Sequence, residues 1–168
     1  MEENTETVFD RLKKKGINYS VAGGSYLGKA MQNLLFPALS NFKSLPYERR
    51  VQFEIPEEYL DYLSTVDNNT IKPVGQDLYI YGLFEALSST VNYTDREENT
   101  EYQPVFWLSV GHRSDRGNFF ICCDKASELY GQVGEFYDSS PFLFLEDFAR
   151  VGNGFADFCE NVLAGKVY

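Results

Sequence analysis

Residues 105–123, VFWLSVGHRSDRGNFFICC, predict two β-strands joined by a short polar turn. Residues 105–110 and 118–123 are rich in the β-branched and aromatic side chains that favour strands. The polar stretch between them begins at Gly111 and ends at Gly117, and glycine is a common turn residue. A turn this short can join antiparallel strands, whereas parallel strands need a crossover of roughly a dozen residues or more. The segment therefore favours an antiparallel meander.

The strand pattern continues on both sides of this pair. It predicts strands at 78–84 and 132–137, and it allows a fifth short strand at 142–145. The separating segments carry turn residues and charges: they are Gly75-Gln76-Asp77, the stretch 94–104, and Asp124 to Gly131. The alternation of Val51, Phe53 and Ile55 also allows a short extended stretch earlier in the chain.

Helical periodicity dominates the N-terminal part of the chain. Residues 3–15 predict a short helix that stops at Gly16 and places lysines near the negative end of its dipole. A loop is expected at 17–24, with Ser25 as the N-cap of a second helix. Six apolar residues with helical spacing between 27 and 38 predict that helix.

Two further helices are expected. Pro56 suits the first helical position of one of them, with Glu57 and Glu58 in its first turn and a turn at Asp67-Asn68-Asn69 after it. Its expected inner face is formed by Tyr59, Leu60, Leu63 and Val66. The apolar spacing within 155–163, followed by Gly165, predicts the C-terminal helix.

Helices followed by strands and a final helix are typical of an α+β fold with segregated layers. We expect an antiparallel meander sheet of about four to six strands, with N-terminal helices and a C-terminal helix packed on it. A length of 168 residues matches a single domain, which we place over residues 1–168. The apolar content of 43% is that of an ordinary globular chain.

The net charge of −10 argues against two classes of partner. Nucleic-acid binding needs a basic surface, and docking on an anionic membrane needs cations, so neither is expected. The N-terminus, MEENTE, lacks the positive start and apolar core of a secretory signal, which predicts a cytoplasmic location. With 3 cysteines and 1 histidine, we expect no disulfide framework, metal or other cofactor.

Acidic side chains concentrate in residues 51–104, which hold 11 Asp and Glu but only 2 Lys and Arg. Such density steers a basic partner, although a solvated surface that aids solubility is the plainer interpretation. Tyr79 and Tyr81 share one face of an expected strand in this region, and tyrosine gives contact area at low entropic cost. The candidate partner-binding residues are Glu57, Glu58, Asp61, Asp77, Tyr79, Tyr81, Glu97, Glu98 and Glu101.

A catalytic interpretation would depend on His112, which lies near Asp115 and could form an acid–base pair with it. No obvious nucleophile accompanies them, so a turn with a local Asp–Arg pair is the simpler interpretation. Cys122 and Cys123 point to opposite faces of a strand and are expected to behave as small apolar residues. Trp107 is expected in the core, although a strand tryptophan can also anchor an interface.

Three segments, in order, resemble the SUKH superfamily, which includes fungal cell-wall-synthesis regulators of the SMI/KNR type, the Syd proteins and many bacterial immunity proteins. The first is 55–63, IPEEYLDYL, which is similar to a helix start of the form L-P-x-[DE]-Y. The second is VFWL at 105–108, leading through Gly111 to NFFICCD at 118–124. The third combines GQV at 131–133 with FADF at 155–158.

The likeness covers roughly residues 51–164, and residues 1–50 match poorly. It implies a binding module without catalytic machinery, since many bacterial members neutralise a cognate toxin of a polymorphic or contact-dependent system, often a nuclease. The acidic balance fits this role, because a nuclease presents a basic groove to its phosphates.

We therefore expect a cytoplasmic immunity-type protein that neutralises a basic, nuclease-like toxin domain through acidic surface complementarity. One alternative is a regulatory or scaffold protein of the same fold that binds an endogenous protein partner. The other is an enzyme that uses His112 and Asp115.

Overall fold

Among the residues that the structure describes, seven antiparallel strands lie side by side in the order in which they occur along the chain. This computed structural model describes residues 5–19, 51–94, 107–114, 117–136 and 148–167. Across the sheet the strands are β1 (Gly16–Tyr19), β2 (Thr70–Pro73), β3 (Leu78–Ile80), β4 (Trp107–Arg113), β5 (Asn118–Cys122), β6 (Val133–Phe136) and β7 (Ala149–Gly152).

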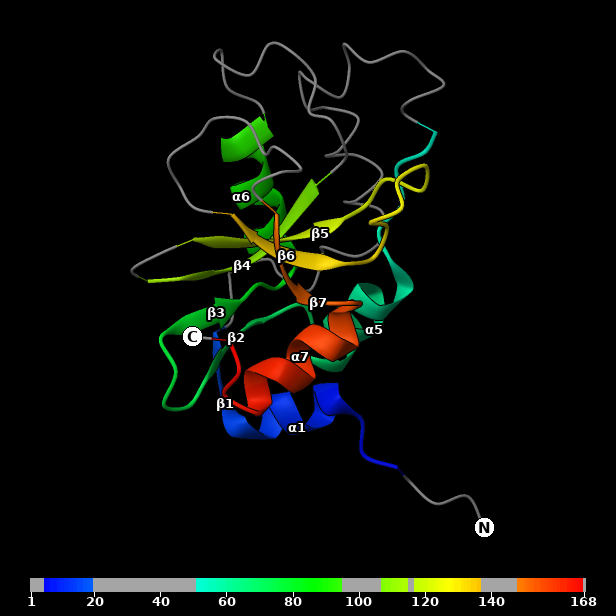
Figure 1. Ribbon diagram of the computed structural model, residues 1–168. Helices are drawn as coiled ribbons and strands as arrows, with labels where there is room; N and C mark the ends of the chain where they lie inside the picture. Colours follow the sequence, from blue (N-terminus) through cyan, green and yellow to red (C-terminus); the bar gives the residue numbers. More distant parts are fainter. Residues whose placement is uncertain (1–4, 20–50, 95–106, 115–116, 137–147, 168) are drawn as a thin grey trace.

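The described helices cover both faces of this sheet. They are α1 (Val8–Lys15), α5 (Glu57–Thr65), α6 (Leu83–Thr94) and α7 (Phe155–Leu163). The helices α1, α5 and α7 contact one another and form one layer, whereas α6 packs against β4 from the other side (Figure 1). The predicted α+β class, with an antiparallel meander and a C-terminal helix, is confirmed, although the sheet has more strands than the expected four to six.

The main core lies between the sheet and the layer formed by α1, α5 and α7. The ring of Phe155 lies 4.8 Å from that of Tyr59, 5.0 Å from that of Tyr62 and 6.0 Å from that of Phe9. Both tyrosine hydroxyls donate to backbone carbonyls of β3 or its end, at 2.8 Å for Tyr59 and 3.4 Å for Tyr62. The two buried phenols are therefore satisfied without leaving the core.

A second apolar cluster occupies the opposite face of the sheet. It consists of Trp107, Phe120, Cys122 and Phe136, with Leu129 and Phe148 packed against it. Trp107 is only 2% exposed and meets Phe136 edge to face at 5.1 Å, which confirms the expectation that it belongs to a core.

Several local predictions are confirmed. Thr7 caps α1 through a capping box with Asp10, and α1 lies within the predicted segment 3–15. The strands β5 and β6 coincide broadly with the segments predicted for them, and α7 spans the predicted 155–163. β4 was predicted to end at Val110, but it continues through Gly111 to Arg113, where a turn was expected. The turn after α5 places Asp67 and Asn68 at φ angles of 55° and 60°, a conformation that Asp and Asn adopt more readily than most residues. The expected inner face of α5 lacked Tyr62, which is fully buried, and included Leu60, which is only partly buried.

The strand predicted over 78–84 is wrong in its second half. β3 ends at Ile80 and α6 begins at Leu83, because the chain turns at Gly82. The amide of Gly82 donates to Thr70 Oγ1 at 2.9 Å, and a Cβ at this position would lie 2.0 Å from a backbone oxygen of Asn68. The close approach requires glycine, and it redirects the backbone from strand to helix.

Three strands were missed: β1, β2 and β7. Gly16 does not end α1 in a left-handed conformation but starts β1 with extended backbone at φ −112°. The loop predicted at 17–24 is therefore a strand as far as Tyr19. Pro73, which reads as a strand breaker, stands at the very end of β2, where proline is tolerated.

Two boundaries also differ. Pro56 is the N-cap of α5 rather than its first helical residue, at φ −56° and ψ 140°. The extended stretch allowed at 51–55 reduces to one bridge between Phe53 and Asp124. The predictions that lie outside the described residues are the rest of the 17–24 loop, the helix at 27–38 with Ser25, the separator beyond residue 94, and the strand at 142–145.

Candidate functional site

A row of partly exposed side chains crosses the sheet from β1 to β5. The antiparallel register pairs Ile17 with Lys72, Tyr79 with His112, and His112 with Asn118. The pairing of Ile71 with Ile80 brings Lys72 beside Tyr79. Directly opposed residues project from the same face, so these side chains form one line, the transverse row: Ile17, Lys72, Tyr79, His112 and Asn118. Ile17 is 47% exposed and the other four are half-buried.

The centre of the transverse row is a stack of rings. The rings of Tyr79 and His112 lie 5.0 Å apart at an angle of 14°. Lys72 Nζ lies 6.0 Å from the centroid of the Tyr79 ring and donates to the carbonyl of Gln76 at 2.7 Å. The stack is thus bordered on the β2 side by a cation that already has a hydrogen-bond acceptor.

Tyr81 fixes the other side of the imidazole. Its hydroxyl lies 2.6 Å from His112 Nδ1, and the two rings are 5.4 Å apart. Burial lowers the pKa of His112 below its ordinary value of 6.5, while the carboxylates of Asp77 and Glu85 oppose that shift. Burial also raises the pKa of Tyr81 to about 12. The phenol therefore stays protonated near neutral pH, and burial keeps the His112 imidazole neutral to a lower pH than an exposed histidine.

Hydroxyl groups connect this pair to α6. Ser89 Oγ donates to Ser109 Oγ at 2.8 Å, and the Ser109 amide donates to Thr90 Oγ1 at 2.9 Å. Ser89 also lies close enough to the Tyr81 phenol for a hydrogen bond that partly offsets the rise of its pKa. A chain of polar contacts therefore runs from the buried Ser109 on β4 through Ser89 and Tyr81 to the half-buried His112. It holds α6 and β3 in fixed positions.

Asp77 borders the transverse row at the start of β3. It is exposed, and it accepts a hydrogen bond from Ser114 Oγ at 2.6 Å. The Ser114 amide also donates to the Asp77 carbonyl at 3.2 Å. These bonds tie the carboxylate to the end of β4, close to His112.

The structure divides the candidate partner-binding residues between two layers. It brings together Asp77, Tyr79 and Tyr81 on the sheet face that also carries α6. Glu57, Glu58 and Asp61 lie on α5, whose inner residues pack on the opposite face. Glu97, Glu98 and Glu101 lie outside the described residues.

Glu58 has a structural role that distinguishes it from its neighbours. Its Oε1 accepts a hydrogen bond of 3.1 Å from the amide of Ala156 in the first turn of α7. The N-cap of that helix, Gly154, supplies no side-chain bond, so Glu58 acts as a cap from another element. Glu57 and Asp61 are exposed, and among the described side chains they form no ion pair.

The sulfur groups show no sign of reactivity. All three cysteines are buried and unpaired with one another, and burial raises the pKa of each thiol. The partner that the sequence suggested for His112, Asp115, lies outside the described residues. Within the described ranges, no three His, Cys, Asp or Glu side chains are placed to hold a metal ion.

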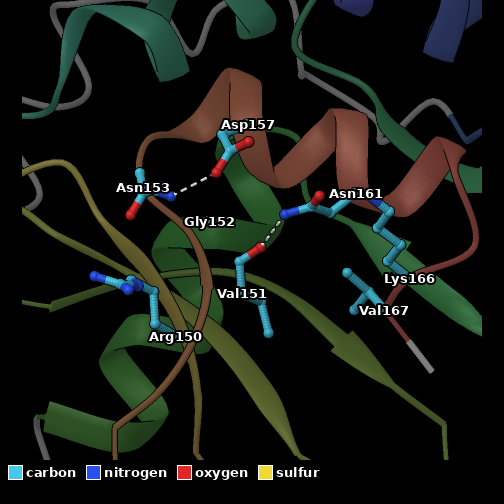
Figure 2. Close-up of a pocket in the computed structure, with 8 residues that line it drawn as sticks. All are labelled: Arg150, Val151, Gly152, Asn153, Asp157, Asn161, Lys166 and Val167. Atoms are coloured by element: carbon cyan, nitrogen blue, oxygen red, sulfur yellow. Dashed lines mark hydrogen bonds between the residues drawn. The ribbon is translucent and has the colours of Figure 1, made fainter.

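A cavity of about 270 Å³ lies between β7, α7 and the residues that follow it (Figure 2). The Asn153 amide donates to Asp157 and the Asn161 carboxamide donates to the Val151 carbonyl, both at 2.9 Å. Arg150 and Lys166 stand at opposite sides of the cavity in Figure 2 and do not converge on one point. The polar groups of this cavity are largely used to hold α7 on β7.

Comparisons with protein-family models, with curated proteins and with solved structures find no match. None of the described helices is both long and apolar enough to cross a membrane.

Sequence reasoning missed the residues that the register adds to the site. Lys72, Glu85, Ser89 and Ser114 carry no motif, and β2 and α6 were not predicted. The helical spacing of Leu83, Ala86 and Leu87, followed by Thr90, was the available signal for α6. No comparable signal pairs Tyr79 with His112, because that pairing depends on the strand register.

Proposed function

We propose that this chain is an immunity-type binding protein that neutralises a cognate toxin with a basic, nuclease-like domain. It acts by occupying the partner's basic surface with its own acidic surface and carries out no covalent chemistry. The resemblance of residues 51–164 to the SUKH superfamily suggests this role, and a cytoplasmic location goes with it.

The observation that carries the proposal is a set of acidic groups without cationic partners. Residues 54–85 hold seven acidic residues, and among the described side chains the ion pairs use other acids, Glu6, Glu135 and Glu160. Uncompensated carboxylates repel one another in the free protein and gain from a basic partner. A surface of this sign suits a protein that competes with phosphates for a basic groove.

The placement of the reactive side chains gives further support. The thiols are buried, and Tyr81 and the hydroxyls of Ser89, Ser109 and Thr90 are engaged in contacts between elements. His112 is packed between two tyrosine rings. These roles favour a rigid recognition surface over a catalytic centre.

The test is capture of a partner followed by a functional assay. The tagged chain is used to retain proteins from lysate of its own source cells, and each retained protein is identified by mass spectrometry and purified. We expect a basic polypeptide that is released by salt and that arrests growth when expressed alone. Co-expression of this chain should restore growth.

Charge-reversed variants then show whether the acidic surface is responsible. Glu97, Glu98 and Glu101 are reversed together, and Glu57 is reversed with Asp61. The control reverses Glu6, which pairs with Lys14 of α1, together with Glu128, an exposed acid between β5 and β6. We expect at least one of the test variants to slow association and the control to leave it unchanged. Retention of a non-toxic endogenous protein would contradict the proposal and support the regulatory alternative, whereas full protection by every variant would show that neither of these two acidic groups is the contact.

A further inference from the structure

We propose that the transverse row, with Asp77 and Glu85 beside it, is the surface that receives an arginine-bearing segment of the basic partner. The nature of the partner rests on the proposed function, whereas the site itself can be tested without the partner. On this proposal the acidic groups beside the row form the contact, and those on α5 do not.

The first argument is preorganisation. Strand register, ring stacking at 5.0 Å and the 2.6 Å contact between the Tyr81 hydroxyl and His112 Nδ1 hold the three rings in place before any partner arrives. Binding at such a surface costs little side-chain entropy. Tyr79 is half-buried, and tyrosine is a typical anchor of protein interfaces, whereas the buried Tyr81 supports the stack from within.

The second argument is the charge around the imidazole. Asp77 approaches from the turn before β3 and Glu85 from α6, and both act on His112 electrostatically. The other elements packed around it contribute Lys72 from β2, Tyr79 and Tyr81 from β3, and the uncharged Asn118 from β5. The described site thus holds two carboxylates and one cation, and Lys72 is already bonded to the Gln76 carbonyl.

The third argument concerns the chemistry of the cation. Lys72 Nζ over the Tyr79 ring, at 6.0 Å, shows that a cation is accommodated beside this stack. A guanidinium group is planar, stacks on aromatic rings and donates to carboxylates in a fixed geometry, whereas an ammonium group behaves as a hydrated point charge. An aromatic stack with carboxylates on two sides therefore favours arginine over lysine.

The neutral form of His112 is the binding form, because an imidazolium at the centre of the row would repel the guanidinium. Binding and protonation should consequently oppose each other. By reciprocal linkage, a bound arginine probe lowers the pKa of His112, and acid weakens probe binding.

The experiment uses an oligo-arginine peptide as the probe and follows the imidazole of His112 by NMR. The chain contains 1 histidine, so the signal is unambiguous. We expect saturable shifts of the His112 and Tyr79 ring signals at one peptide per chain, and a lower pKa of His112 in the complex. An oligo-lysine peptide of equal length should bind about tenfold more weakly.

Two double variants of equal charge locate the site. Asp77→Asn with Glu85→Gln removes two carboxylates beside the row, and we expect it to weaken oligo-arginine binding about tenfold. Glu57→Gln with Asp61→Asn removes two carboxylates from α5 and should change binding less than about twofold. Equal losses in both variants, equal affinity for the two peptides, or an unmoved His112 signal would each overturn the proposal.

Failure of this site and failure of the proposed function give different results. If a captured toxin loses affinity only when α5 is charge-reversed, the immunity function stands and the transverse row is not the contact. If the row binds oligo-arginine as described but no toxic partner is retained, the site stands and the proposed function falls.

Discussion

Arg113 and Glu135 form an ion pair that is almost wholly inside the protein, with side chains 9% and 5% exposed. Arg113 Nε lies 2.8 Å from Glu135 Oε2, and Nη2 donates to Oε1 at 3.2 Å. The guanidinium also lies over the ring of Phe119 at 5.6 Å. Each charge depends on the other, because neither can be solvated by bulk water at this depth.

Glu135→Gln should therefore lower the free energy of unfolding by about 3–5 kcal/mol, since it leaves the guanidinium buried without its counter-charge. Urea unfolding followed by circular dichroism measures the change. The control is Glu160→Gln, which removes the partner of Arg11 from a pair with half-exposed side chains and should cost about 0–1 kcal/mol. Similar losses of unfolding free energy in the two variants would show that the buried ion pair contributes no more to stability than the exposed one.

His112 should make stability depend on pH near neutrality. Its folded-state pKa lies below the unfolded value of 6.5, so the unfolded chain takes up the proton more readily. Its contribution to stability is complete above pH 6.5 and is lost as the pH falls through the folded-state pKa. We expect the urea midpoint of the natural protein to fall over this window relative to that of His112→Gln, and a constant difference between the two would contradict the assignment.

At the scale of elements, the packing of α7 depends on α5. The Glu58 carboxylate caps the first turn of α7, whose own N-cap is a glycine. Helix caps of this kind stabilise because the first amides of a helix have no partner within it.

Glu58→Ala should consequently cost about 0.5–2 kcal/mol of unfolding free energy, whereas Glu57→Ala, one residue earlier and exposed, should stay within about 0.5 kcal/mol of the natural protein. Thermal and urea denaturation of the two purified variants make the comparison directly. If the two variants are equally stable, the hydrogen bond from the Ala156 amide to Glu58 does not stabilise α7.

The elements that the sequence predicts are those whose side chains repeat with one clear period. The segments predicted for β4 and β5, 105–110 and 118–123, are dense in apolar and aromatic residues, and α7 has apolar residues at each helical turn. β2 contains a lysine and a proline within four residues, and its existence depends on pairing with β1 and β3. α6 is rich in serine and threonine, whose weak helix preference conceals its apolar spacing.

At the scale of the whole molecule, a net charge of −10 should weaken the free protein through self-repulsion. Raising NaCl from about 0.01 M to about 1 M shortens the Debye length from about 30 Å to about 3 Å. We expect the urea midpoint to rise over this range, and to rise less in the variant that combines Glu57→Gln with Asp61→Asn. A midpoint that falls with salt would mean that favourable ion pairs outweigh the repulsion.

The candidate site also belongs to this scale, which explains why the sequence revealed only its parts. Asp77, Tyr79 and Tyr81 drew attention through charge and aromatic content, and His112 through its chemistry. These side chains meet only because β3 pairs with β4 in one particular register, although α6 separates the two strands in the sequence. A one-residue slip would move His112 to the opposite face, and nothing local in the sequence specifies that choice.

The contact between α1 and α7 has a consequence for synthesis on the ribosome. Successive strands of the sheet can pair as they leave the ribosome, because each strand pairs with the one synthesised just before it. Phe9 and Arg11, however, meet their partners Phe155 and Glu160 only when the far end of the chain has been translated. A nascent chain stalled ahead of residue 155 would therefore expose to chaperones the side of α1 that α7 covers in the folded protein. The helical layer is complete only after α7 has been synthesised.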